Sequence, residues 1–435
     1  MARCIIFWGN WQAIFQGVGD PRNPHLIKYP LAQLLCTGVL LFVFRLGSRR
    51  EANYRLRSNG PSAAKFAAWF GVNDVPHGDT LDYAFRQVTV AEVQEAECRL
   101  VEGLIRKKVL YRYRLLGVCY LVAIDGTGVL SFRERHCPHC LTRRLSKGEI
   151  LYYHPVLEAK LVTSNGFVFS LMTEFIENAD LQGDKQDCEL KAFYRLTKRL
   201  KARFHRLPIC LLLDGLYAGG PTFQLCQDYD WRYLIVLQDD DLPQVHRSFE
   251  AVMSHLPHNQ KQVCLGKKGQ TRQSYRWAWG IEYRDSHDRL HHLNLLECLE
   301  QTEPQQEKPT KYLWLTNFTL TSYNVNLLAN QGGRLRWKIE NEGFNVQKNG
   351  GFNLEHPYSQ NENARKVFYL LLQIAHLITQ LMEKGSLLRQ AFPQGWGSSR
   401  NLAFRLLEAW RNLPLSPDGW VSLYGGRYQI RFDSS

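Results

Sequence analysis

The sequence has little that would place it in or across a membrane. Its longest apolar stretch, residues 31–44, is interrupted by Gln33 and Thr37, and at about 14 residues it falls short of the roughly 20 that a bilayer span needs. The apolar run at the start of the chain is also too short for a secretory signal. We therefore predict a cytoplasmic protein with no membrane partner, in which residues 31–44 form a buried helix.

A disulfide framework is also lacking. The chain has 11 cysteines, an odd number, and several of them, such as Cys36, Cys119 and Cys210, lie among apolar residues. This usage is typical of reduced, buried thiols in a cytosolic protein.

The sequence contains no internal repeat or low-complexity tract, and its 45% of apolar residues excludes a disordered chain.

Negative charge is in deficit. The chain carries 54 basic and 41 acidic residues, so its formal net charge is +13 and its isoelectric point about 9.2. A basic surface favours polyanions, of which DNA is the commonest large one. The charge alone also leaves open a basic protein that has no nucleic-acid role.

Changes of pattern divide the chain into five segments. These are residues 1–115, 116–240, 241–325, 326–385 and 386–435. The first reads as helical and has no helix-turn-helix signature, so it is either a domain that binds DNA ends or a helical support for the rest. The second mixes strands and helices, the third is β-rich, the fourth returns to helix, and the last combines a helix with a terminal strand-like stretch.

The second segment predicts the fold class. Apolar stretches at 120–124, 151–162 and 167–174 read as a meander of three strands. A helix, a strand at 209–213, a second helix and a strand at 233–237 follow. This order is that of a ribonuclease H-like mixed α/β sheet, in which the first and fourth strands can lie side by side. We therefore expect a catalytic core of this kind, completed by the fourth segment and carrying the third as a β-rich insertion.

Two aspartates and one glutamate stand where such a fold could bind metal ions. Asp125 and Asp214 each end an apolar strand, and ligand sites in open α/β sheets favour such strand ends. Glu340 lies in a stretch that reads as helix. Three carboxylates of this kind can hold two divalent ions about 4 Å apart, which clamp both oxygens of a phosphoryl displacement. Mg²⁺, with Mn²⁺ as an alternative, prefers such hard oxygen ligands. Each acid taken singly reads as a turn or salt-bridge residue; together they favour the metal site.

Side chains near Glu340 predict contacts with DNA. Arg336 lies four residues before it, and Gln347 and Lys348 lie seven and eight after it, so all share one face of a regular helix. Arg336 and Lys348 could then contact phosphates beside the metal ions. Gly343 weakens the helix by about 1 kcal/mol relative to alanine, so the register is expected to slip there. An ordinary charged helix face is the alternative.

The β-rich segment contributes further basic candidates. Lys267, Lys268 and Arg272 lie in a turn before a strand at 273–284. That strand alternates and places Tyr275, Trp277, Trp279, Ile281 and Tyr283 on one face. We expect this face to be sheet core, with a base-stacking platform as the alternative.

A cysteine pair lies in the loop after the first strand. Cys137 and Cys140 form a CxxC motif, with His136 beside it and His154 further along. These residues could hold a structural zinc ion, although one CxxC without a second pair fits free thiols equally well.

The remaining acidic stretches have ordinary interpretations. Asp187 and Glu189 open a predicted helix, where they would act as caps and partners of the helix dipole. Asp239, Asp240 and Asp241 follow the strand at 233–237 and are expected to form an exposed turn.

The segment around Glu340 resembles the DDE transposases of bacterial insertion sequences, in the branch with a β insertion and a YREK signature. That signature is Tyr, two residues, Arg, three residues, Glu, six residues and Lys. Arg336 and Glu340 match it; Gly333 stands at the Tyr position, and Gln347 stands at the Lys position with Lys348 next to it. The signature is therefore half met.

The stretches 125–128 and 339–349 are also similar to this group, and the likeness covers roughly residues 116–385. The resemblance implies a ribonuclease H-like fold and Mg²⁺-dependent strand cleavage at Asp125, Asp214 and Glu340, followed by transfer of the element's 3′ ends. It also implies double-stranded DNA partners (terminal inverted repeats and target DNA), a homodimer in the synaptic complex, and a place at the bacterial nucleoid. Two alternatives stay open: a catalytically inactive or domesticated DNA-binding derivative, and another ribonuclease H-like nuclease.

Overall fold

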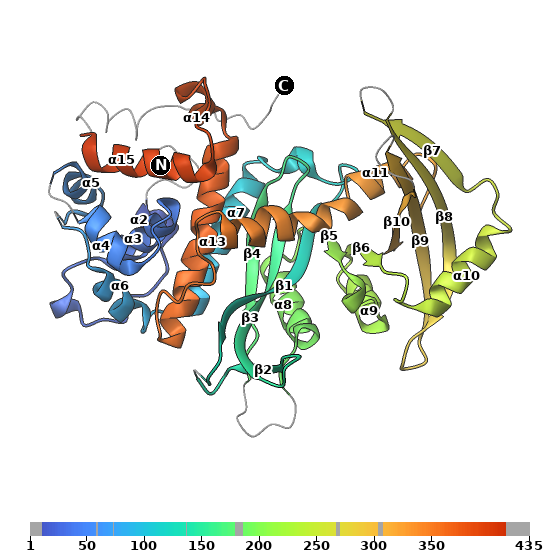
Figure 1. Cartoon of the computed structure of the whole chain (residues 1–435), viewed down its shortest axis with the longest axis horizontal. Helices are drawn as coiled ribbons and strands as arrows, with labels where there is room; N and C mark the ends of the chain where they lie inside the picture. The colour runs from blue at the N-terminus through green and yellow to red at the C-terminus, as the bar shows by residue number, and fades with distance from the viewer. Residues whose placement is uncertain are drawn as a thin grey trace.

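The structure is a computed structural model in which three regions follow one another: a bundle of N-terminal helices, a central sheet, and a β-rich end (Figure 1). It describes residues 11–57, 60–72, 74–135, 137–178, 186–266, 270–302 and 308–414. The predicted site residues His136, Lys267 and Lys268 lie outside these ranges, as does the strand expected near the C-terminus.

The first region is helical, as its lack of strand alternation predicted. Its main helices are α3 (Leu31–Val43), α4 (Arg49–Leu56), α5 (Pro61–Phe70), α6 (Gly78–Phe85) and α7 (Val90–Arg106), and the shorter ones are α2 (Trp11–Ile14), η2 (Pro24–Leu26) and η3 (Tyr111–Tyr113). The prediction of a buried helix at 31–44 is confirmed, because α3 packs against the long helix α13 (Glu362–Lys384). Gly38 permits this close approach: a Cβ there would lie 2.6 Å from Leu371 Cδ1.

A ten-stranded mixed sheet forms the centre and the β-rich end. Its strands are β1 (Tyr120–Phe132), β2 (Leu141–Arg144), β3 (Ile150–Val162), β4 (Val168–Phe175), β5 (Ile209–Leu213), β6 (Arg232–Leu237), β7 (Gln260–Leu265), β8 (Thr271–Arg284), β9 (Leu290–Thr302) and β10 (Thr310–Thr316). The order is β2-β3-β1-β5-β6-β10-β9-β8-β7, with β4 also paired to β3. β5 is parallel to both β1 and β6, and the other neighbouring pairs are antiparallel. The predicted mixed α/β class is thus confirmed.

The central strands are apolar because both of their faces are covered. In β1, Val122 belongs to one hydrophobic core and Leu121 to another; in β5, Leu211 and Cys210 divide in the same way. Near-continuous apolar runs are typical of parallel strands that are buried on both sides. The first core extends without a break from the sheet to the N-terminal helices, so the two regions fold around shared apolar residues.

The predicted β insertion is continuous with the central sheet. β10 pairs with β6, from Leu313 opposite Leu237 to Thr316 opposite Leu234, and β9, β8 and β7 follow in order. Figure 1 shows these strands as an extension of the sheet away from the N-terminal helices. The insertion therefore adds to the core instead of forming a separate unit.

The aromatic face of β8 is sheet core over only part of its length. Tyr275 and Trp277 are buried in one hydrophobic core as expected, and Trp279, which is 43% exposed, donates from its ring nitrogen to Leu320 O of the same core at 2.9 Å. Ile281 and Tyr283 pack with the other core, so they were wrongly predicted to share this face. The register of β8 against β9 shifts between Ala278 and Ile281, at a bulge where Gly280 has a φ of +65°. One extra residue reverses the alternation, so Ile281 and Tyr283 point to the opposite face of the sheet.

Helices cover the sheet and close the chain. They are α8 (Glu189–Arg203), η4 (Gly215–Tyr217), α9 (Gly220–Asp228), α10 (Pro243–Met253), α11 (Val325–Asn330), η5 (Gly333–Trp337), η6 (Ile339–Asn345), α12 (Val346–Asn349), α13, α14 (Ser386–Ala391) and α15 (Ser399–Asn412). α13 lies between the N-terminal helices and the sheet, and α15 returns to α5 (Figure 1). The Trp410 ring of α15 meets the Phe66 ring of α5 edge to face. In the described ranges, no helix combines the length and the apolar character that a bilayer crossing requires.

Candidate active site

The two predicted aspartates lie next to each other because their strands do. β1 and β5 pair in parallel up to Ala123 opposite Leu212, and the next residues along these strands lead to Asp125 and Asp214. Asp214 accepts a hydrogen bond from Leu216 N at 3.0 Å, which caps the short η4 helix. β1 does not end at residue 124 as predicted: it continues to Phe132 through pairing with β3, so Asp125 projects from within a strand.

The segment that carries Glu340 is helical, but it is not a regular α-helix. It begins as the 3₁₀-helix η5, continues as the π-helix η6 over residues 339–345, and ends as the α-helix α12. The expected slip of register at Gly343 is present, since this glycine lies within the π-helical turn. π-helical turns are rare and are found frequently at functional sites.

Arg336 connects this helical segment to the strands. Its guanidinium lies 3.0 Å from Glu340 Oε1 and 3.7 Å from Asp125 Oδ2, and its side chain is only 7% exposed. The structure therefore brings Asp125, Asp214 and Glu340 to one place, with a buried cation between the first and the last. In this arrangement Arg336 faces the acids, and its predicted contact with a DNA phosphate stays a prediction.

Two further carboxylates belong to the same cluster, and both were assigned other roles from the sequence. Glu189, at the start of α8, accepts a hydrogen bond from Tyr217 Oη at 2.6 Å. A Cβ on Gly126 would lie 2.5 Å from Glu189 Oε2, and a Cβ on Gly215 would overlap the Asp241 carboxylate. The glycine after each predicted aspartate thus makes room for another acid.

Both Asp-Gly pairs were visible in the sequence. Because a glycine next to a candidate ligand often marks a close approach, these pairs were the signal that could have led to Glu189 and Asp241. Asp241 lies in the turn after β6, where its carboxylate accepts a hydrogen bond from Gln238 N at 2.8 Å. It is partly buried, whereas Asp239 and Asp240 are exposed as predicted.

The clustered acids repel one another. Burial raises the pKa of Asp125 from the ordinary 3.8 to about 7; Arg336 opposes this rise, and the charges of Glu340, Asp214 and Glu189 add to it. Burial also raises the pKa values of Asp214 and Glu189, with nearby carboxylates contributing. Carboxyl groups with pKa values raised in this way mark a candidate functional site. Several acids here share one arginine, so a bound cation would relieve the repulsion among them.

The donor chemistry of the cluster fits Mg²⁺ or Mn²⁺. All of its donors are carboxylate oxygens, which are the ligands that these hard ions prefer. The oxygens of Asp125, Asp214 and Glu340 do not all lie within 4.8 Å of one another. Among the residues described, one group of three possible metal ligands is this compact, and it does not include these acids. Arg336 occupies part of the space between the acids.

A buried polar network holds the Glu340 segment in place from behind. The amide of Gln347 donates to Gln373 Oε1 at 2.7 Å and lies 2.9 Å from His376 Nδ1, and Lys160 Nζ also donates to Gln373 Oε1 at 2.7 Å. Gln347 is fully buried, so the prediction that it contacts DNA is corrected: its amide joins α12 to α13. Lys160 is fully buried as well and forms an ion pair with Glu158 at 3.3 Å.

The other basic candidates lie apart from this network. Lys348 pairs with Glu355 at 2.8 Å, and its side chain is partly exposed. Arg272 is exposed on β8. Their contacts with DNA stay predictions.

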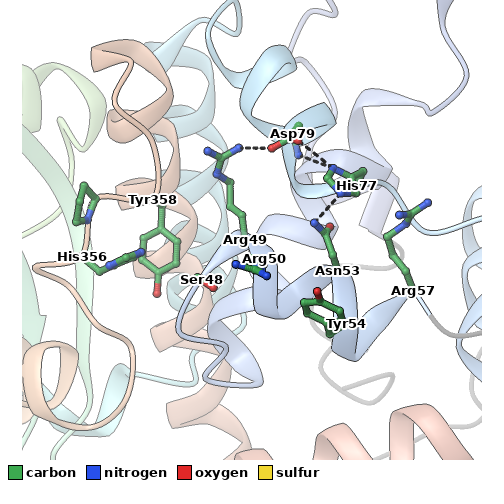
Figure 2. Close-up of a pocket in the computed structure, with 11 residues that line it drawn as sticks. Ser48, Arg49, Arg50, Asn53, Tyr54, Arg57, His77, Asp79, His356 and Tyr358 are labelled. Atoms are coloured by element: carbon green, nitrogen blue, oxygen red, sulfur yellow. Dashed lines mark hydrogen bonds and ion pairs between the residues drawn. The ribbon is translucent and has the colours of Figure 1, made fainter.

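A concave site lies among the N-terminal helices, apart from the carboxylate cluster. This basic pocket has a volume of about 650 Å³, and α4, the start of α6 and the turn before α13 contribute to it (Figure 2). It is lined by Ser48, Arg49, Arg50, Asn53, Tyr54, Arg57, His77, Asp79, His356, Pro357 and Tyr358. Arg49 pairs with Asp79 at 3.3 Å, which leaves the lining with an excess of positive charge.

The cysteine pair also gathers with one predicted partner. Cys137, Cys140 and His154 converge, whereas His136 is outside the described residues and His139 turns to Asn178 O at 2.8 Å. This cluster is distinct from the carboxylates.

Comparison of the sequence with protein-family models and with curated proteins finds no match in either.

Proposed function

We propose that the protein is a DDE-type DNA transposase that cleaves and transfers DNA strands in a metal-dependent reaction at the ends of an insertion sequence. The observation that carries the proposal is the cluster of Asp125, Asp214 and Glu340, brought together by two adjacent parallel strands and one helical segment. The pKa of Asp125 adds support: burial is the main cause of its rise, and the charges of Glu340, Asp214 and Glu189 add to it.

The strand order supports a ribonuclease H-like core. β4, β3, β1, β5 and β6 lie side by side in that order, with β1 antiparallel to β3 and parallel to β5. This arrangement is the one expected for a three-stranded meander followed by two α/β units. Strands β7–β10 correspond to the β insertion of the resembled branch, and α13 covers the sheet after the Glu340 segment.

Asp125, Asp214 and Glu340 would hold Mg²⁺ or Mn²⁺, and Glu189 and Asp241 lie close enough to support them. Bound divalent ions would activate a water or a 3′-hydroxyl and stabilise the leaving oxygen of a phosphodiester. The chain's own part is to position these acids. Tyr217 fixes Glu189, Leu216 N fixes Asp214, and Arg336 holds Glu340 while offsetting the repulsion among the carboxylates.

Double-stranded DNA is the proposed partner, as terminal inverted repeats and as target. The net charge of +13 favours a polyanion. The basic pocket offers arginines that could receive DNA phosphates beside α4; Lys348, paired with Glu355, and Arg272, exposed on β8, offer further positive charge. A homodimer in the synaptic complex and a place at the bacterial nucleoid belong to the same proposal.

The test is Mg²⁺- or Mn²⁺-dependent cleavage of DNA that carries the flanking ends of this gene's own element. The wild type is compared with Glu340→Gln and with Glu342→Gln as the matched control. Glu342 lies in the same π-helical turn but pairs with Lys338 at 2.7 Å, away from the aspartates. We expect cutting at the element ends by the wild type and the control, and none by Glu340→Gln.

The other outcomes assign the rival functions. A folded wild type that binds the ends but does not cut them would support a catalytically inactive DNA-binding derivative. Cutting without preference for the ends would support a general ribonuclease H-like nuclease. Full activity of Glu340→Gln would remove Glu340 from the proposed ligands.

A further inference from the structure

A cluster of two thiols and one imidazole lies beyond the end of β1. Cys137 Sγ is 3.5 Å from Cys140 Sγ, and His154 Nε2 lies 3.3 Å and 3.2 Å from these two sulfur atoms. Cys140 and His154 are buried and Cys137 is partly buried. Within the described part of the chain, no other group of three or more possible metal ligands is this compact. We infer that Cys137, Cys140 and His154 bind a zinc ion that fastens the loop after β1 to β3.

The distances between the donors match those around a tetrahedral zinc ion. With zinc–sulfur bonds of about 2.3 Å and zinc–nitrogen bonds of about 2.0–2.1 Å, two sulfurs would lie about 3.8 Å apart and a sulfur and a nitrogen about 3.5 Å apart. The separations in the cluster are shorter by only about 0.3 Å. These three donors therefore occupy three corners of a tetrahedron, and water or another donor takes the fourth.

The same geometry argues against a disulfide and against Mg²⁺. A disulfide requires a sulfur–sulfur distance of about 2.05 Å, which is much shorter than the separation of Cys137 and Cys140. Thiolates and imidazole are soft or borderline ligands that select zinc over the hard ions expected at the carboxylate cluster. The two sites would thus take different metals.

Hydrogen bonds around the cluster orient the loop so that the thiols point inward. Asn178 donates from its amide to Cys140 O at 3.0 Å, and its backbone N–H donates to His139 O at 3.3 Å. His139, although it lies within the CxxC loop, turns its Nδ1 to Asn178 O. Such supporting contacts around the ligands are typical of metal sites.

The position of the cluster indicates a structural role. His154 lies on β3 opposite Leu130 of β1, so the ion would tie the end of β1 to the strand beside it. Asn178 also accepts from Asp187 N at 3.0 Å, two residues before Glu189 of the carboxylate cluster. A bound ion would therefore steady both β1 and the start of α8, and this inference stands whether or not the protein is a transposase.

The test measures metal in the full chain, purified under reducing conditions and dialysed without chelator. We expect about one zinc per chain in the wild type, as one such site implies, and loss of the zinc in Cys137→Ser, Cys140→Ser and His154→Ala. Cys188→Ser and Cys264→Ser are the matched controls, because they remove exposed thiols outside the cluster. Chelation should lower the melting temperature of the wild type, and added zinc should restore it.

A second measurement keeps the inference testable if the cluster variants do not fold. Cobalt(II) added to the chelated wild type should give the thiolate-to-cobalt absorption of a site with sulfur ligands, and zinc should displace it. A folded wild type that retains no zinc and gives no such band overturns the inference. A Cys137–Cys140 disulfide in the non-reduced protein, found by peptide mass spectrometry, overturns it as well.

Discussion

Replacing Asp125 with asparagine is expected to abolish cleavage and, at the same time, to stabilise the metal-free protein. In the folded chain, burial raises the pKa of this carboxyl group to about 7, with neighbouring acids adding to the effect. In the unfolded chain the group titrates near its ordinary value of 3.8. Protonation of Asp125 therefore favours the folded state. Its contribution to the free energy of unfolding is complete below about pH 4 and is lost as the pH rises to about 7.

The magnitude follows from the two pKa values. A tenfold change in a protonation equilibrium corresponds to about 1.4 kcal/mol, so the ionised Asp125 costs the metal-free fold at most about 4 kcal/mol above pH 7. Its side chain is 15% exposed, so solvent screening reduces this figure only in part. Asparagine has nearly the same shape and carries no charge, and the variant should escape most of this cost.

The assay is thermal or urea unfolding of the metal-free protein between pH 5 and pH 8, with Asp228→Asn, an exposed acid on α9, as the control. The stability gained by Asp125→Asn should grow with pH and level off above about pH 7. Mg²⁺ or Mn²⁺ should raise the melting temperature of the wild type more than that of the variant. A variant less stable than the wild type at pH 8, or a gain independent of pH, would refute the reasoning.

Three further outcomes are expected. Asp214→Ala and Glu340→Ala should each reduce DNA cleavage below detection, as Asp125→Ala should, while circular dichroism and DNA binding stay near the wild type; full activity in either variant would contradict the assigned triad. Glu97→Gln should stabilise the protein increasingly as the pH rises, because burial and the nearby Glu158 carboxylate raise the pKa of Glu97 well above its ordinary value, and urea unfolding at two pH values measures this. Arg50→Ala should weaken DNA binding and lower the slope of log K against log salt by about 0.9, because one phosphate contact at the basic pocket is lost; an unchanged slope would remove Arg50 from the DNA surface.

The elements that follow from local pattern could be predicted from the sequence. The apolar stretches before Asp125 and Asp214 form strands as predicted, and residues 31–44 form the predicted buried helix, because their patterns reflect which faces are covered. The continuation of β1 beyond residue 124 was not predictable in this way. Its Gly-Thr-Gly stretch has low strand propensity, and the pairing with β3 decides its conformation.

A long-range contact accounts for one other difference, and a local change of helix type for another. Glu189 was interpreted as a helix-end acid, because nothing in the sequence shows that Tyr217 and Gly126 lie against it. Gln347 was placed on a DNA-facing helix surface, since a regular helix was assumed where the chain forms a π-helical turn. A single change in the number of residues per turn redirects every later side chain, and the sequence carries no sign of it beyond Gly343.

The shared hydrophobic core has a consequence for the distance between the DNA sequence that is bound and the position that is cut. Because α3 and α13 pack around the same apolar residues as the sheet, continuous apolar packing among the described residues connects the helices of the basic pocket to the strand of Asp125. Under the proposed function, DNA bound at the basic pocket would reach the carboxylate cluster at a fixed distance from the pocket. The spacing in base pairs between the bound sequence and the cut would then be a property of the protein's interior, and only changes in that packing could alter it.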